Sequence, residues 1–224
     1  MYIVSVCFCV SSVANSSRSL TWGYVNFAPY HYDVDGKVQG LIADRVERLF
    51  KQVDLHYNAV ELPAKRAQLY IEQGKVDFST VIDSFIPTPE KFFKSDAPVY
   101  TIKLGAICLQ PNLSISSFSD LKRYPVILIS GYTYGTDKTF TRKDGYQITV
   151  EAQTHENAIK ALIFERGECV LGYYGPFQYE NAKYPEQQFH FYQIQQLPVH
   201  LFLSKDAPGA ESIITTINRI AENL

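Results

Sequence analysis

The sequence predicts an α/β protein built from two similar lobes, and three observations lead to this prediction. Apolar runs of strand length alternate with segments of helical periodicity along the chain. One pattern occurs twice, at Glu72-Gln73-Gly74 and at Glu165-Arg166-Gly167, where a helix ends and a strand follows. The chain has 224 residues, of which 46% are hydrophobic. That length and composition suffice for one large domain or two small ones with a real core.

The first half of the chain supplies the elements of one lobe. Strands are expected at residues 20–25, 55–60 and 76–82. A helix is expected to bury Ile42, Val46, Leu49, Phe50 and Val53, which share one face at helical spacing. The segment 33–36 is expected to form a turn. Pro63 is expected to open a second helix that ends at Gly74, and residues 88–90 have the pattern of a short helix start.

The second half repeats this order. Strands are expected at residues 104–109, 125–129, 147–151, 169–174, 189–194 and 199–203, and a short helix at 116–121. Thr154 is expected to cap a helix that ends at Gly167. The last helix is expected to carry Ile213, Ile214, Ile217, Ile220, Ala221 and Leu224 on one face.

Composition and motifs exclude several classes of function. The formal net charge is -2, so nothing favours nucleic acid or an anionic membrane as a partner. The sequence has no P-loop, GxGxxG, HExxH or GxSxG motif, and its five histidines lack metal-ligand spacing. We therefore expect no cofactor, no bound metal and no enzymatic activity, although carboxylates that meet only in the fold keep an enzyme open as an alternative.

The N-terminal segment from Met1 to Ala14 is predicted to be a secretory signal peptide. It is apolar and ends with the small residues Ser12-Val13-Ala14, although no Lys or Arg precedes Arg18. A first strand is the alternative. The segment is too short for a transmembrane helix, so we expect an exported, soluble, monomeric protein.

Two cysteines remain outside that segment, Cys108 and Cys169, each in an apolar run of strand character. In an oxidising compartment they could bridge. Two buried, unbridged cysteines are the more common arrangement, and the sequence leaves both open.

Four loops are candidates for a common binding cleft, because each follows the carboxyl end of an expected strand. They span residues 26–30, 83–87, 131–135 and 173–177. Ligands of open α/β sheets bind beyond those strand ends. If two lobes face each other, the four loops line one cleft. The sequence has 16 tyrosines, several of them in these loops, which suggests a wet, aromatic lining.

For individual residues in these segments, the sequence permits both a ligand-binding role and a structural role. Phe27 and Tyr30 flank a proline and are suited to stacking on a solute, or they cap the core. Arg66 could hold an anion at the start of its helix, or it makes a surface salt bridge. Thr133 offers a hydroxyl in a loop bounded by glycines, or serves the turn. Of Tyr173 and Tyr174, one is expected to point away from the core.

The order and spacing of several short motifs resemble bacterial extracellular solute-binding proteins of family 3, the periplasmic binding proteins of polar amino acid ABC transporters. The resemblance spans most of the chain after the N-terminal segment. The matching segments are Phe27-Ala28-Pro29-Tyr30, Asp35 to Gly40, Gln73 to Asp77, Thr88 to Lys91, Ser95 to Tyr100, Ser119 to Lys122, Gly131 to Gly135, Ala158 to Leu162 and Ser204 to Pro208.

This resemblance implies the type II periplasmic-binding-protein fold, with two lobes of mixed sheet and flanking helices joined by two hinge strands. The implied lobes are residues 19–104 with 200–224, and residues 105–199. It also implies that Phe27 stacks on the ligand and that Ser84 and Thr133 lie in the ligand loops of the two lobes.

The sequence departs from the family where amino-acid binders carry their charged anchors. The stretch Pro89 to Phe92 has no Arg for a ligand carboxylate, and Gly172 to Gly175 has no acid for a ligand ammonium. Arg66 and Asp83 are possible replacements. Burying a zwitterion without paired charges is costly, so without them the ligand is not an ordinary α-amino acid.

The sequence thus predicts a periplasmic protein that captures a small polar solute, amino-acid-like or an aromatic or organic acid, for the permease of an ABC transporter. A sensory or interaction protein on the same fold is the alternative, and an enzyme using the cleft is a third. The residues predicted to bind ligand are Phe27, Tyr30, Arg66, Asp83, Ser84, Thr133, Tyr134, Tyr173 and Tyr174.

Overall fold

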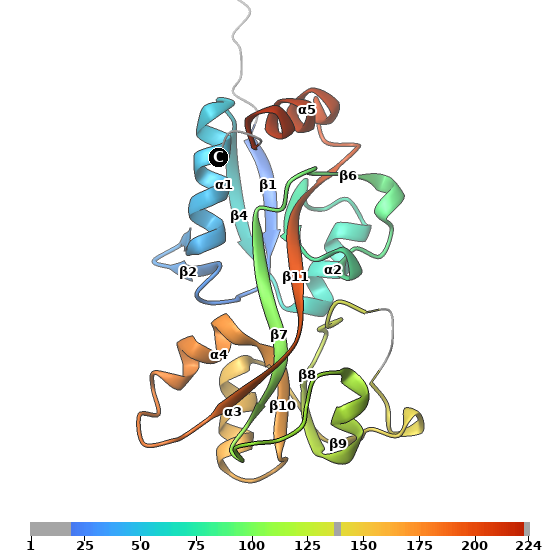
Figure 1. Cartoon of the computed structure of the whole chain (residues 1–224). Helices are drawn as coiled ribbons and strands as arrows, with labels where there is room; N and C mark the ends of the chain where they lie inside the picture. The colour runs from blue at the N-terminus through green and yellow to red at the C-terminus, as the bar shows by residue number, and fades with distance from the viewer. Residues whose placement is uncertain (1–18, 137–139, 222–224) are drawn as a thin grey trace, which may run out of the picture.

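A computed structural model describes residues 19–136 and 140–221, and it has the predicted α/β architecture of two lobes. Two long strands run between an upper and a lower lobe in Figure 1. One curled sheet extends through both lobes in the order β4-β1-β5-β11-β7-β10-β8-β9, with β6 also paired to β11. The predicted signal segment, Met1 to Ala14, lies outside the described residues.

The upper lobe in Figure 1, called the first lobe below, is formed mainly by the first half of the chain. Its strands are β1 (Ser19–Tyr24), β4 (His56–Glu61), β5 (Phe78–Val81) and β6 (Phe92–Lys94). Its helices are α1 (Leu41–Gln52), α2 (Ala64–Glu72) and α5 (Ala210–Ala221). Short 3-10 turns occupy Asp83–Phe85 and Pro89–Lys91, and β2 (Tyr32–Val34) and β3 (Lys37–Gln39) form a separate hairpin. β1 is parallel to both β4 and β5.

The second lobe holds β8 (Pro125–Ile129), β9 (Gln147–Ala152), β10 (Cys169–Tyr173), α3 (His155–Ile163) and α4 (Tyr174–Asn181). Short 3-10 turns occupy Phe118–Arg123 and Arg142–Asp144. β8 lies between β9 and β10 and is parallel to both. α3 and α4 contact one another beside this sheet (Figure 1).

Two strands connect the lobes: β7 (Tyr100–Cys108) and β11 (His190–Ser204), which pair antiparallel from one lobe into the other. Residues of β11 up to Val199 pair with β7, and those from His200 pair with β5 of the first lobe. The sequence predicted two separate strands at 189–194 and 199–203, and this prediction is wrong, because the strand continues through Pro198. At Pro198 the strand pairs with β7 alone, so the missing N–H of proline can face the unpaired side.

Most helices form where periodicity and caps predict them. In α1, Ile42, Val46, Leu49 and Phe50 are buried on one face, as expected. The Thr154 hydroxyl accepts a hydrogen bond from the Asn157 N–H and caps α3. The expected end of α3 at Gly167 is wrong. The helix ends at Ile163 and Glu165 takes the left-handed conformation, while a Cβ at Gly167 would lie 2.7 Å from Ile127.

The sequence does not predict helix α4, because the dipeptide Gly175-Pro176 is typical of a loop. Pro176 lies in the first turn of this helix, where its missing N–H costs no hydrogen bond. The predicted short helices at 116–121 and 88–90 are short 3-10 helices, at Phe118–Arg123 and Pro89–Lys91. Among residues 19–136 and 140–221, no helix is both long and apolar enough to cross a membrane.

The buried side chains form two clusters. The larger one includes Trp22, Phe50 and Phe78 of the first lobe and continues through β7 and β11 into the second lobe, where it includes Leu121 and Leu171; the smaller one surrounds α3. Cys108 and Cys169, whose state the sequence left open, form a disulfide that joins β7 to β10.

Candidate functional site

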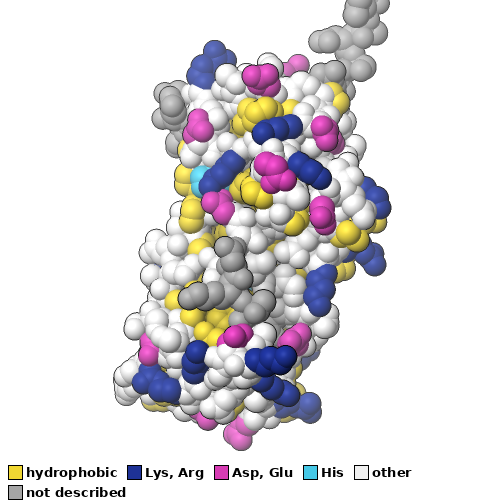
Figure 2. Space-filling model, turned by 90° about the vertical axis from the view of Figure 1, so that its right-hand side faces the viewer, with side chains coloured by type: hydrophobic (Ala, Val, Ile, Leu, Met, Phe, Trp, Pro, Cys, Tyr) yellow, Lys and Arg dark blue, Asp and Glu magenta, His cyan; other side chains and the backbone are white. Residues whose placement is uncertain are grey.

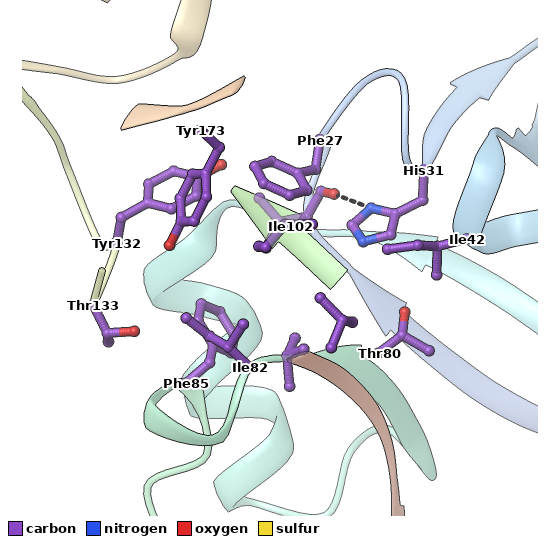
Figure 3. Close-up of a pocket in the computed structure, with 13 residues that line it drawn as sticks. Phe27, His31, Ile42, Thr80, Ile82, Phe85, Ile102, Tyr132, Thr133 and Tyr173 are labelled. Carbon is purple, nitrogen blue, oxygen red and sulfur yellow. Dashed lines mark hydrogen bonds between the residues drawn. The ribbon is translucent and has the colours of Figure 1, made fainter. Parts of the chain in front are cut away.

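A small cavity of about 50 Å³ lies between the lobes, against the hinge strands (Figure 3). The first lobe contributes Phe27, His31 and Phe85, among others; the second contributes Tyr132, Thr133 and Tyr173; β7 and β11 contribute Ile102 and Val199. Pockets for drug-sized ligands measure roughly 300–1,000 Å³, so this space is suited to water or to a very small solute. Rings and hydroxyls of the two lobes are in contact beside this cavity, and we call this conformation closed; a solute larger than the cavity needs the lobes to part there.

Aromatic rings of the two lobes meet at the cavity. The Phe27 ring of the first lobe lies 5.1 Å from the Tyr173 ring in an edge-on arrangement and 6.1 Å from the Tyr132 ring, measured between centroids. The His155 ring, at the start of α3, lies 5.4 Å from Phe27 and 5.3 Å from Tyr132. These separations are in the range of favourable ring contacts. The closed form is thus held together partly by an aromatic contact that crosses the cleft.

The loop after β1 holds Phe27 in place by its own hydrogen bonds. The Phe27 N–H donates to the His31 carbonyl at 2.8 Å, and the Tyr30 N–H donates to the Phe27 carbonyl at 2.8 Å. The Tyr30 ring packs on Phe27 at 5.2 Å and on Tyr100 of β7 at 5.1 Å. Because both ends of this tight loop are fixed, the Phe27 ring is positioned before any solute arrives.

Two further contacts join the lobes directly. The hydroxyls of Ser84 and Thr133 are hydrogen-bonded across the cleft at 2.8 Å. The Tyr30 side chain lies against Gly175 of α4, where an added Cβ would come within 2.4 Å of the Tyr30 hydroxyl oxygen. Both contacts would be lost when the lobes separate.

Two histidines beside the cavity are neutral at physiological pH. The Nδ1–H of His31 donates to the Val25 carbonyl at 2.8 Å, since a carbonyl can only accept (Figure 3). Burial lowers the pKa of His31 to about 4. Burial likewise lowers the pKa of His155 to about 3, and its Nε2 is buried without a hydrogen-bond partner.

Three hydroxyls at the cavity lack a hydrogen bond among the described residues. The Thr80 Oγ1 is buried without a partner. The structure shows no hydrogen bond from the hydroxyl of Tyr132 or Tyr173, and burial raises the pKa of both phenols above the usual value. Buried polar groups usually have partners, so these hydroxyls are available to a solute or to water.

Two grooves adjoin the cavity and carry the charged groups that it lacks. One, of about 700 Å³, shares Val25 and Tyr132 with the cavity. Its charged lining residues are Asp33, Glu61, Lys65, Glu156, Glu180 and Lys183. The other, of about 340 Å³, shares Tyr132 and Thr133 and also reaches Lys65. Over the face in Figure 2, side chains of both charges are interspersed.

The structure brings some of the predicted residues together. Phe27, Thr133 and Tyr173 line the cavity, and Ser84 is hydrogen-bonded to Thr133. Tyr30 supports Phe27 from behind. Tyr134 lines the smaller groove, but its hydroxyl is occupied, since it accepts from the Ile129 N–H at 2.6 Å.

Six predicted residues do not line the cavity: Tyr30, Ser84 and Tyr134, which lie near it, and Arg66, Asp83 and Tyr174. Arg66 is exposed on α2. Asp83 forms an ion pair with Lys94 at 2.7 Å, and both side chains are largely exposed. Tyr174 packs on Phe191 at 4.9 Å, in the separate cluster around α3. The proposed substitutes for the family's charged anchors therefore lie away from this cavity.

Sequence reasoning did not select several residues of the site. His31 and His155 were set aside because their spacing does not suit a metal, yet both rings lie at the inter-lobe contact. Thr80 lies within β5, where nothing in the sequence separates it from a structural position. His31 directly follows the Phe27 to Tyr30 loop, and that adjacency is the one signal that could have identified it. The described part of the chain holds no group of three or more His, Cys, Asp or Glu side chains suited to a metal ion.

Comparison with known proteins finds similarity in structure. No family model matches the sequence. No curated protein matches it either. Among solved structures, the GluR0 ligand-binding core in complex with L-glutamate is 17% identical, covers 93% of this chain and 94% of its own, and has a TM-score of 0.72.

Two further structures show the range of such proteins. The arginine-, lysine-, histidine-binding protein ArtJ of Geobacillus stearothermophilus is 14% identical, with 92% of this chain and 90% of its own covered and a TM-score of 0.67. A histidine kinase sensor domain with similarity to periplasmic binding proteins is 12% identical, with 90% and 88% covered and a TM-score of 0.71.

Proposed function

Because this chain has the two-lobed fold of periplasmic binding proteins, we propose that it captures a small polar solute between its lobes. One observation supports the proposal: the cavity is lined by both lobes and by the strands that connect them. The size of the cavity and its access to solvent therefore change when the lobes move relative to each other. Ligand pockets favour such inter-domain positions.

The mechanism is a shift between open and closed populations. In the open form Phe27 is separated from Tyr132 and Tyr173, and a solute can enter between the rings. A solute favours closure only by binding the closed form more tightly than the open form. The closed form already has its own cross-lobe contacts, the ring cluster and the hydrogen bond between Ser84 and Thr133. The solute must therefore replace or add to these contacts.

We further propose that the protein is exported and delivers an amino-acid-like or aromatic solute to the permease of an ABC transporter. The predicted signal segment and the disulfide between Cys108 and Cys169 support export, since disulfides persist in oxidising compartments. ArtJ, a protein with the same fold, binds basic amino acids.

The experiment is a thermal-shift screen of the protein against amino acids, polyamines, organic acids and small aromatic compounds. A ligand at about a hundred times its dissociation constant stabilises by ~2.7 kcal/mol. For a chain of this size that corresponds to a rise in Tm of roughly 5–10 °C. Small-angle scattering should then show a more compact particle with the hit than without it. Absence of any hit, together with an unchanged scattering profile, would reject the proposal.

A sensory role on the same fold is the second candidate, favoured by the similarity to a histidine kinase sensor domain. Both roles need the same ligand site. They differ in the partner protein that binds the closed, ligand-bound form. Co-purification from cells with and without the identified ligand should distinguish them, since transport requires contact with a permease and sensing requires contact with a signalling protein.

A further inference from the structure

The described lining of the inter-lobe cavity carries no formal charge at neutral pH. Its ionisable side chains are His31, Tyr132 and Tyr173, and all three are neutral there, because burial lowers the pKa of the imidazole and raises that of the phenols. The two charged anchors expected from the sequence, Arg66 and Asp83, do not line it. Asp83 pairs with Lys94, and Arg66 is exposed. A carboxylate or ammonium group placed in this cavity would thus lose its hydration without gaining an opposite charge.

The walls of the cavity favour a flat solute. Phe27 stands on the first lobe and Tyr132 and Tyr173 on the second. In the closed form the Phe27 ring is edge-on to Tyr173, at 85°, and tilted by 37° to Tyr132, so opening the lobes separates these ring contacts. A planar group inserted between them would restore ring contact on both sides. The rest of the lining includes the aliphatic side chains of Ile82, Ile102 and Val199 and the ring of Phe85.

The lining also provides hydrogen bonds. The Thr80 hydroxyl is buried without a partner, and the described residues show no hydrogen bond from the hydroxyls of Tyr132 and Tyr173, so each of the three can donate or accept. In Figure 3 the Tyr173 ring extends from β10 into the cavity with its hydroxyl leading. Neutral hydroxyls satisfy neutral partners such as amides, carbonyls and hydroxyls. They do not offset the desolvation of a full charge as an ion pair does.

We propose that this cavity binds an uncharged, planar solute that carries hydrogen-bonding groups, held between Phe27 and the two tyrosines of the second lobe. This inference rests on the proposed function, because the rings must part for the solute to enter. It narrows the ligand from the broad class of small polar solutes to one without a carboxylate or an ammonium group. The grooves outside, with Lys65 and the acidic side chains, remain accessible to charged groups on a larger solute.

A matched series of probes tests charge directly. Benzamide, benzoate, benzylamine and phenylalanine share a phenyl ring and differ in charge, and each is titrated calorimetrically into the full chain near neutral pH. We expect benzamide to bind at least tenfold more tightly than each charged probe, which corresponds to 1.4 kcal/mol. Equal or tighter binding of a charged probe, or no heat from benzamide at millimolar concentration, would overturn the inference.

Variants then place the bound probe in the cavity. Thr80→Val and Tyr132→Phe each remove a hydroxyl and preserve shape, and each should weaken benzamide binding about fivefold. Thr149→Val is the matched control, because this exposed position on β9 does not line the cavity. If both cavity variants bind benzamide as tightly as the unmodified protein does, the probe lies elsewhere and the inference is wrong.

The proposed function and this inference fail in different ways. A charged solute that binds and compacts the protein in solution scattering leaves the proposed function standing and removes the neutral-ligand inference. If no solute of the broader screen compacts the protein, both are rejected.

Discussion

A hydrogen bond between the hydroxyls of Ser84 and Thr133 crosses the cleft beside the cavity. It is formed without a solute, so it contributes to the closed form itself. A single neutral hydrogen bond contributes ~1 kcal/mol net. That is enough to change the ratio of closed to open molecules about fivefold.

We therefore expect Ser84→Ala to shift the protein toward the open form. Thr133→Val should do the same, and the double variant should be no more open than either single one, because one bond connects the two residues. Fluorescence energy transfer between dyes on the two lobes measures the shift. Ser119→Ala, at an exposed position on the second lobe, is the control. Additive effects of the two substitutions would show that the bond does not govern closure.

Protonation of His31 makes the free energy of unfolding depend on pH. Burial lowers its pKa to about 4 in the folded protein, against about 6.5 in the unfolded chain. The unfolded chain thus binds the proton more readily. The folded protein is therefore most stable, as far as His31 is concerned, above the pKa of the unfolded chain. This contribution to the free energy of unfolding is lost as the pH falls from about 6.5 to about 4. For this one group the loss is about 2 kcal/mol at pH ~5.

The variant His31→Asn should flatten that part of the profile, because asparagine keeps an N–H donor toward the Val25 carbonyl but does not titrate. Urea unfolding at a series of pH values measures the slope. His56 is exposed on β4, so His56→Asn should leave the slope unchanged. A slope that is equally steep in the His31 variant would assign the dependence to other groups, His155 first.

At the scale of elements, the disulfide between Cys108 and Cys169 ties β7 to β10 within the second lobe. It closes a loop of 61 residues, for which chain entropy alone corresponds to about 4 kcal/mol. We expect reduction to lower the Tm of the protein, and we expect the double variant Cys108→Ala with Cys169→Ala to have that lower Tm and to be insensitive to reductant. Thermal unfolding with and without a phosphine reductant is the measurement. Equal Tm values in all conditions would mean that the strand pairing already supplies the constraint.

How well the sequence predicted an element depended on whether its signal is local. Helix α1 has the helical spacing of Ile42, Val46 and Phe50, and α3 has its capping threonine, so both were predicted. The continuity of β11 was not, because Pro198 breaks a strand in most settings and is accepted here only where β7 is the sole neighbour. Such a condition is set by tertiary structure and is not visible in the sequence.

The same distinction applies to the site. Phe27, Thr133 and Tyr173 were predicted because each lies at or just beyond the carboxyl end of a strand, which is a property of the chain order. The pairing of Asp83 with Lys94 depends on how side chains meet in space. So does the approach of His155 to Phe27 from the other lobe. Those contacts decide the charge of the cavity, and the sequence alone left that charge open.

For the molecule as a whole, we expect closure to depend on the fit between Tyr30 of the first lobe and Gly175 of the second. A Cβ at Gly175 would lie 2.4 Å from the Tyr30 hydroxyl oxygen and 2.5 Å from its ring carbon Cζ. The Tyr30 ring cannot move aside easily, because it is buried and packs on both Phe27 and Tyr100. Alanine at this position should therefore hold the lobes apart while leaving each lobe intact.

We expect Gly175→Ala to fold normally, since position 175 lies within α4 and alanine favours a helix over glycine by ~1 kcal/mol. Its solution scattering should be that of a more open particle, and saturating ligand should compact it less than it compacts the unmodified protein. Gly172→Ala is the matched control, because its Cβ would meet only Ile107 and Val170, neither of which belongs to the first lobe. If Gly175→Ala closed as fully as this control, the contact with Tyr30 would not limit the approach of the lobes, and the ring cluster around Phe27 would be left to set the closed geometry.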